Sequence, residues 1–130
     1  MGFGDWEGLT YAEILERDPQ NLIAWDTDPV HIPPPGGETV AQVAARVQSA
    51  IGDISRAHQD QTVLLVAHSG SLRMLLCLAL GLEPQAQWQF RLDIAALYEL
   101  EFHEAGAIVN YMNDTKHLVG KSTWAFRGLR

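Results

Sequence analysis

Hydrophobic residues recur at helical spacing in the middle of the chain and predict one long amphipathic helix over residues 39–58. Its apolar positions lie three or four residues apart and share one face: Val40, Val43, Ala44, Val47, Ile51 and Ile54. Nearer the start, Thr10 and Glu13 have the spacing of a capping box. We therefore expect a helix over 10–18, which ends before the next proline, and a short helix over 21–25.

A continuous apolar run, Thr-Val-Leu-Leu-Val-Ala, occupies residues 62–67. Its length and its β-branched residues predict a buried parallel strand, because such strands are covered on both faces. The residues His-Ser-Gly-Ser follow at 68–71. The apolar stretch after them predicts a helix over 71–80 that ends at Gly81.

The last third of the chain changes to the pattern of strands. Residues 95–102 and 107–112 are predicted as strands, and the short link with Gly106 indicates a hairpin. The order helix, strand, helix and hairpin places the chain in the α/β class. We expect a mostly parallel sheet with flanking helices and a C-terminal hairpin, and the 130 residues suit one domain.

Composition narrows the classes of partner. The 9 basic and 16 acidic residues give a formal charge of −7, which argues against non-specific binding of nucleic acid. A local cluster of donors can still bind a small anion on such a protein. The single cysteine, Cys77, lies in an apolar run and is expected to be a buried hydrophobe. The first residues have no signal-peptide pattern, and the apolar run 74–80 is too short to span a bilayer, so we expect a cytoplasmic protein without membrane contact.

The segment around His68 holds the strongest candidate for chemistry. His68 stands where the predicted strand ends, and ligand sites of parallel α/β sheets lie at that end. Ser69, Gly70 and Ser71 then open a helix, whose free backbone N–H groups suit an anion. Arg73 adds a possible cation nearby. The alternative is a histidine that only caps the turn.

A second interpretation concerns the serine beside this histidine. Ala-His-Ser-Gly-Ser loosely resembles a nucleophile elbow, which would make Ser69 the nucleophile. Both flanking glycines of that motif are replaced, and only Asp114 and His117 remain as candidate partners. The histidines of the chain are widely scattered, and no Cys/His spacing indicates zinc.

Four segments carry a family resemblance. Residues 3–10 read Phe-Gly-Asp-Trp-Glu-Gly-Leu-Thr, residues 35–39 read Pro-Gly-Gly-Glu-Thr with Arg46 after them, residues 65–73 surround His68, and residues 113–118 read Asn-Asp-Thr-Lys-His-Leu. In this order they resemble motifs of the histidine phosphatase superfamily, which includes phosphoglycerate mutases and α-ribazole phosphatases.

That resemblance implies hydrolysis of a phosphomonoester through a phosphohistidine, without metal or organic cofactor. His68 corresponds to the second histidine of the family, a catalytic and phosphate-binding residue, and the N–H of Ser69 corresponds to a phosphate donor. Several preorganised donors are needed around phosphorus, since charge builds on its oxygens during transfer. A small phosphorylated substrate is implied, and an α-ribazole phosphatase-like enzyme fits better than a mutase.

The departures from the family pattern concern the reacting groups. The Arg-His-Gly motif with the nucleophilic histidine does not occur in the sequence, and the acid would fall just before Met1. Glu7 corresponds to a structural glutamate of the motif. We therefore expect residues 1–130 to be the C-terminal part of a single histidine phosphatase domain, inactive alone. A fragment, a truncated gene product and one half of a two-chain protein all fit.

The missing segment has a structural consequence. In the family it carries the central strand, so its loss would leave residues 62–67 with an open apolar edge, and such edges pair with other chains. We expect self-association or a partner chain that covers this edge. The alternative function is a catalytically dead phosphate-binding or interaction module.

Overall fold

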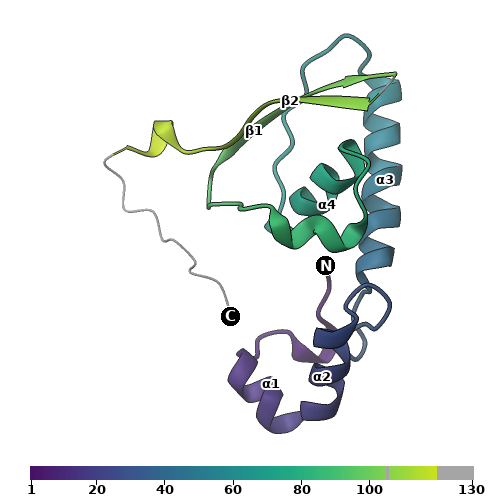
Figure 1. The fold of residues 1–130 in the computed structure, drawn as a ribbon, viewed down its shortest axis with the longest axis vertical. Coiled ribbons are helices and arrows are strands. Elements are labelled where there is room, and N and C mark those ends of the chain that lie inside the picture. The colour runs from purple at the N-terminus through teal and green to yellow at the C-terminus, as the bar shows by residue number, and fades with distance from the viewer. Residues whose placement is uncertain (105, 120–130) are drawn as a thin grey trace.

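The computed structural model describes residues 1–104 and 106–119, where four α-helices precede one β-hairpin (Figure 1). The elements are η1 (Gly4–Trp6), α1 (Tyr11–Arg17), α2 (Pro19–Thr27), α3 (Val40–Ala57), α4 (Ser69–Ala79), η2 (Pro84–Gln89), β1 (Leu97–His103), β2 (Gly106–Asp114) and η3 (Lys116–Leu118), where η marks a 3-10 helix. None of the described helices is both long enough and apolar enough to cross a membrane.

The predicted helices form, and their starts follow the local chemistry. The capping box at Thr10 is confirmed: the Glu13 N–H donates to Thr10 Oγ1 at 3.3 Å, and the Thr10 N–H donates to Glu13 Oε2 at 2.8 Å. Helix α2 is longer than predicted, because Pro19 stands in its first turn, where no N–H is needed. A second capping box, Thr39 with Gln42, starts α3.

The main core lies where α3 meets α4. Val40, Val43 and Val47 of α3 are buried with Met74 and Cys77 of α4. Ala44 and Ile51 pack against this cluster, so the predicted apolar face of α3 is confirmed. Cys77 is fully buried as predicted, and this burial raises the pKa of its thiol. A smaller cluster of Trp6, Ile14 and Leu22 joins η1, α1 and α2.

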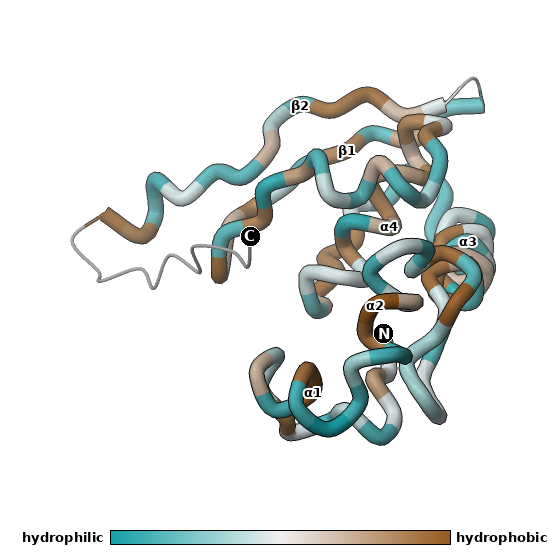
Figure 2. Tube along the Cα trace, turned by 60° about the horizontal axis from the view of Figure 1, so that its bottom comes forward, coloured by the Kyte–Doolittle hydropathy of each residue, from teal (hydrophilic) through white to brown (hydrophobic). Residues whose placement is uncertain are grey.

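The predicted hairpin is confirmed as an antiparallel pair of β1 and β2, with Phe102 opposite Ala107 and a register shift between Leu97 and Leu100. Figure 2 shows hydrophobic stretches on α4 and on β2 alike. The two differ in burial, since α4 holds fully buried residues whereas Ile108 of β2 is 53% exposed. Hydropathy therefore does not tell which stretches reach the core.

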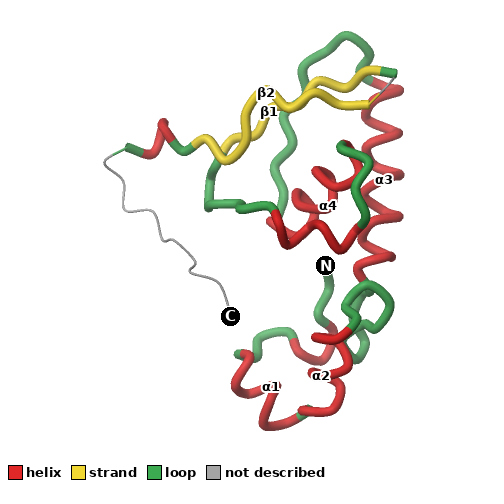
Figure 3. Tube along the Cα trace, viewed as in Figure 1, coloured by secondary structure: helices red, strands yellow, loops and turns green. Residues whose placement is uncertain are grey.

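The prediction of a buried strand over residues 62–67 is wrong for the chain as described. The segment is extended but has no ladder partner, and it appears as a loop in Figure 3. Leu64 and Val66 are 81% and 89% exposed. A strand needs a neighbour that takes its backbone hydrogen bonds, and no described segment takes that place. The fold is α/β, but its described sheet is the antiparallel hairpin, so the expected mostly parallel sheet is not found in residues 1–104 and 106–119.

Candidate active site

His68 stands at the N-terminal end of α4, between the extended segment and the helix. Its backbone (φ −76°, ψ 155°) is extended, and its exposed side chain makes no capping hydrogen bond. The Leu72 N–H donates to the His68 carbonyl at 3.1 Å, which closes the first helical turn. The N–H groups of Ser69, Gly70 and Ser71 therefore have no acceptor within the helix. With the positive end of the helix dipole, they form a setting for an anion beside an imidazole.

A groove of about 300 Å³ adjoins this helix start. Ala67 and Ser71, which flank the candidate site in sequence, both line it, and Arg46 of α3 lines it as well. The other residues that line the groove are all apolar: Val47, Ala50, Ile51, Ile54, Leu65, Val66, Leu72 and Leu75. Arg46 follows the Pro-Gly-Gly-Glu-Thr motif in sequence, but its spacing does not reveal that it lies along the same groove as Ser71.

Arg73, the predicted nearby cation, is held toward η2. Its Nε donates to the Phe90 carbonyl at 3.1 Å, and its guanidinium carbon lies 5.6 Å from the centre of the Trp88 ring. A cation over an aromatic face is attracted by the ring quadrupole. The Arg73 side chain thus joins α4 to the segment after it.

The nucleophile-elbow interpretation of Ser69 has no geometric support. Within the described part of the chain, no hydrogen bond joins Ser69 to Asp114 or His117. Asp114 instead accepts from the Lys116 N–H at 2.8 Å, near the end of the hairpin. A serine nucleophile needs a base within hydrogen-bond reach, and neither Asp114 nor His117 serves Ser69 in this way.

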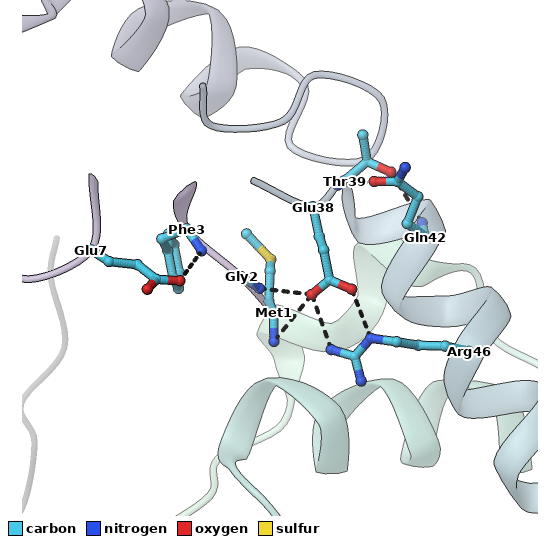
Figure 4. A network of polar contacts seen from close by, with 8 residues as sticks. All are labelled: Met1, Gly2, Phe3, Glu7, Glu38, Thr39, Gln42 and Arg46. Atoms are coloured by element: carbon cyan, nitrogen blue, oxygen red, sulfur yellow. Dashed lines mark hydrogen bonds and ion pairs between the residues drawn. The ribbon is translucent and has the colours of Figure 1, made fainter. Parts of the chain in front are cut away.

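Two of the motif segments that lie about thirty residues apart in sequence pack together (Figure 4). The Asp5 N–H donates to the Pro35 carbonyl at 2.8 Å, and the Glu38 N–H donates to the Gly2 carbonyl at 2.9 Å. Glu7 accepts from the Phe3 N–H at 3.2 Å, a contact within its own turn. These contacts hold the start of the chain beside the start of α3.

Glu38 is the centre of this cluster (Figure 4). Its carboxylate accepts from Arg46 Nε at 2.8 Å, from Arg46 Nη2 at 3.1 Å and from the Gly2 N–H at 2.7 Å. The Arg46 guanidinium and then the Gly2 N–H stabilise the charged form, which lowers the pKa of Glu38 from 4.5 to about 2. The Pro-Gly-Gly-Glu-Thr motif and Arg46 thus have a visible structural role.

We predict that Glu38 makes the free energy of unfolding depend on pH in the acidic range. A carboxyl whose pKa is lowered on folding stabilises the protein above its unfolded pKa, and this contribution is lost as the pH falls from about 4.5 toward 2. The side chain is 32% exposed, so solvent screening reduces the effect to about 1–2 kcal/mol. Glu38→Gln should lower the free energy of unfolding at pH 7 by that amount and flatten its acid dependence, as followed by urea unfolding from pH 7 to 3. Glu16→Gln, on the exposed face of α1, is the control, and an equal loss in both variants would contradict the assignment.

The motif at residues 113–118 holds the hairpin to the loop before it. The side-chain oxygen of Asn113 accepts from the Asp93 N–H and from the Tyr98 hydroxyl, both at 2.8 Å. Its amide donates to Asp93 at 3.0 Å. Burial is the main cause that raises the pKa of Tyr98 to about 12. Asn113, with φ 53°, therefore fixes the end of β2 against residues 91–93.

Comparison with known proteins adds the family. Residues 1–115 match the family model of the histidine phosphatase superfamily (branch 1). The match includes η1, all four helices and both strands of the hairpin. It also includes His68 and the start of α4.

Individual relatives agree with this match. A bifunctional protein of Mycobacterium tuberculosis is 41% identical over 89% of this chain and 32% of its own length. Phosphoserine phosphatase 1 of Hydrogenobacter thermophilus is 30% identical over 88% of this chain and 54% of its own. The crystal structure of the α-ribazole phosphatase from Shigella flexneri superposes with a TM-score of 0.81, at 29% identity, over 88% of this chain and 56% of that one. The chain thus spans about half the length of the two phosphatases, and about a third of the bifunctional protein.

Proposed function

Since this chain belongs to the histidine phosphatase superfamily, we propose that it is the C-terminal part of a single phosphatase domain. The complete protein hydrolyses small phosphomonoesters through a phosphohistidine. A histidine attacks phosphorus, the leaving oxygen takes a proton from a carboxylic acid, and water then releases phosphate from the histidine. The named phosphatases among the relatives support this reaction class.

The observation that carries the proposal is the start of α4. His68 is exposed beside three backbone N–H groups without helical acceptors. A ring N–H of His68 and the N–H of Ser69 would donate to two phosphoryl oxygens, and the helix dipole would favour their negative charge. In this role His68 stabilises the charge that develops on the oxygens of the transferred group. It does not attack phosphorus.

We further propose that residues 1–130 do not turn over substrate alone. The sequence contains no Arg-His-Gly motif, and the acid position would precede Met1. What the chain retains is a site that holds phosphate. Binding and turnover can therefore be measured separately, and they test different parts of the proposal.

Phosphate binding tests the role of His68 directly. The chain should bind inorganic phosphate. Binding is measured by NMR, through shifts of the Ser69 and Gly70 amide signals. His68→Ala should weaken binding about 10-fold or more, because a hydrogen bond to a charged group contributes about 1.5–3 kcal/mol. His58→Ala, an exposed histidine at the other end of the α3–α4 connection, is the matched control and should bind normally. Equal binding by His68→Ala and the unaltered chain would remove His68 from the site.

Hydrolysis of an aryl phosphate by the same proteins tests the missing nucleophile. No turnover is expected from the chain or from His68→Ala. Turnover that the His68→Ala change abolishes would show that His68 does more than hold phosphate. It would then overturn the division of roles proposed above.

A catalytically dead phosphate-binding or interaction module is the second candidate. It is favoured by the same combination of a retained His68 site and an absent Arg-His-Gly motif. Addition of the remaining half of the domain decides between the two candidates. Recovered turnover supports the enzyme, whereas phosphate binding that never leads to turnover supports the module.

Among substrates, a small molecule of the α-ribazole phosphate kind is favoured over the substrate of a mutase. We place the protein in the cytoplasm, where a lone thiol such as Cys77 stays reduced. The mostly parallel sheet is proposed for the complete domain, and self-association or a partner chain would cover the edge at residues 62–67.

A further inference from the structure

Gly2 is held at both of its backbone polar groups by one residue, Glu38 (Figure 4). The Gly2 N–H donates to Glu38 Oε2 at 2.7 Å, and the Gly2 carbonyl accepts from the Glu38 N–H at 2.9 Å. The same carboxylate oxygen lies 3.7 Å from the Met1 nitrogen. We call this contact between Gly2 and Glu38 the Glu38 clamp.

The Glu38 clamp joins two segments that touch closely. A Cβ added at Gly37 would lie 2.8 Å from the Gly2 carbonyl oxygen, so the contact leaves no room for a side chain there. The hydrogen bond from the Asp5 N–H to the Pro35 carbonyl continues the contact along the chain. Glu38 itself stands directly before the capping box that starts α3. The clamp therefore fixes residues 1–5 to the start of the longest described helix.

On its other side the Glu38 clamp reaches the groove beside the candidate phosphate site. Arg46 Nε and Nη2 donate to the two carboxylate oxygens of Glu38 at 2.8 Å and 3.1 Å. Such a bidentate pair fixes orientation as well as distance. Arg46 also lines the groove with Ala67 and Ser71, which flank the turn at His68. Two side chains thus connect the start of the chain to the groove at the start of α4.

In the proposed function, the proton donor of the complete domain directly precedes Met1. Its Cα would lie about 3.8 Å from that of Met1, because one trans peptide separates the two residues. The Glu38 clamp holds the next residue, Gly2, and its carboxylate lies beside the Met1 nitrogen. The clamp is therefore placed to fix the backbone that carries the donor.

A proton donor needs such a hold because its position decides its efficiency. As the nitrogen–phosphorus bond forms and the phosphorus–oxygen bond breaks, the carboxylic acid gives its proton to the leaving oxygen and becomes a carboxylate. The water that later hydrolyses the phosphohistidine returns a proton to this carboxylate. The acid must lie within hydrogen-bond reach of the leaving oxygen, and a displacement of about 1 Å can lower the rate about 100-fold.

We propose that Glu38 is a positioning residue for the proton donor of the complete domain, which it holds through both backbone groups of Gly2. Arg46 fixes the direction of the Glu38 carboxylate from α3. This inference rests on the proposed function and deepens it, by naming the residues that place the donor relative to the His68 site. The simpler alternative, an ion pair that only stabilises the fold, predicts the same loss of rate for every substrate.

Leaving groups of different quality separate these two roles. The substrates are a simple alkyl phosphate, whose alkoxide must be protonated as it leaves, and 4-nitrophenyl phosphate, whose phenolate leaves as the anion. The enzyme is the complete domain, residues 1–130 joined to the half that precedes them. The ratio kcat/KM reports the transition state in which the leaving group departs. Glu38→Ala should lower this ratio about 100-fold for the alkyl phosphate and less than about 5-fold for the aryl phosphate.

Thr39→Ala is the matched control, because it changes the next residue without touching the Glu38 clamp. Thr39 Oγ1 accepts from the Gln42 N–H at 3.0 Å, so its loss also destabilises the start of α3. Both substrates should then slow by the same small factor. Glu38→Gln keeps an oxygen for the Gly2 N–H but loses the charged pair with Arg46, so it should show the same split between substrates at smaller size.

Hydrogen exchange of the Gly2 amide tests the Glu38 clamp itself in the 130-residue chain. This amide should exchange about 10-fold or more slowly than in a free peptide of the same first residues, because a bonded N–H exchanges only when its contact opens. Glu38→Ala should remove the protection, whereas Thr39→Ala should keep it.

Two results would overturn the inference and leave the proposed function intact. One is an equal loss of kcat/KM for the two substrates in Glu38→Ala, and the other is a Gly2 amide that exchanges as fast as in the free peptide. If the complete domain hydrolyses neither ester, the proposed function fails and this inference falls with it. If Glu38→Ala does not fold, Glu38→Gln decides by the same comparison of substrates.

Discussion

Leu76→Ala should lower the free energy of unfolding by about 2–4 kcal/mol, because it removes a buried side chain and leaves a cavity. Leu76 lies on α4 and is only 2% exposed. Urea unfolding followed by circular dichroism measures the loss. It is a large share of the 5–15 kcal/mol that holds an ordinary domain together.

Leu64→Ala is the control for Leu76→Ala, because it makes the same chemical change at an exposed position. Leu64 is 81% exposed, so its truncation should change stability by less than about 0.5 kcal/mol. The contrast measures where the core ends in the isolated chain. A loss from Leu64→Ala as large as that from Leu76→Ala would mean that residues 62–67 are already buried in solution.

Gly4→Ala should destabilise the chain by about 3 kcal/mol or more, through strain and a clash together. Gly4 has φ 53°, and a Cβ there would lie 2.2 Å from the Pro35 carbonyl oxygen. The backbone would have to separate at the contact between Asp5 and Pro35. The Glu38 cluster would move with it, so the loss should also reduce the acid dependence of stability.

Gly8→Ala separates the two causes. Gly8 has φ 82° but nothing within 4 Å of the position of a Cβ, so only the backbone strain of about 1–2 kcal/mol applies. The difference between the two variants reports the close approach of the first motif to residues 35–37. Equal losses in urea unfolding would show that this contact does not form.

Local patterns were sufficient for the elements whose stability is local. The capping box at Thr10 and the apolar spacing along α3 predicted helices because each helix satisfies its own backbone groups. The hairpin was predictable for the same reason, since its two strands are neighbours in sequence. The family resemblance followed from motifs in order, and residues 1–115 match that family.

The parts of the site that join distant segments came only from the structure. The Glu38 carboxylate binds Arg46 and the Gly2 N–H, and the Asn113 side chain binds Asp93. Each motif could be recognised in the sequence, but the residues that it binds could not, because hydrogen bonds between distant residues depend on how the elements pack. Likewise, Arg73 is held by Phe90, across the turn to η2.

At the apolar run 62–67, the local pattern predicts the conformation, but the packing of the chain decides whether the run is buried. The β-branched and apolar residues of this run favour an extended, buried conformation, and His68 follows directly where that conformation ends. That the run is extended but uncovered, with Leu64 and Val66 in solvent, became apparent from the packing of the whole fold. The physical reason is that a β-strand, unlike a helix, cannot satisfy its own backbone hydrogen bonds, so its burial depends on a neighbouring strand.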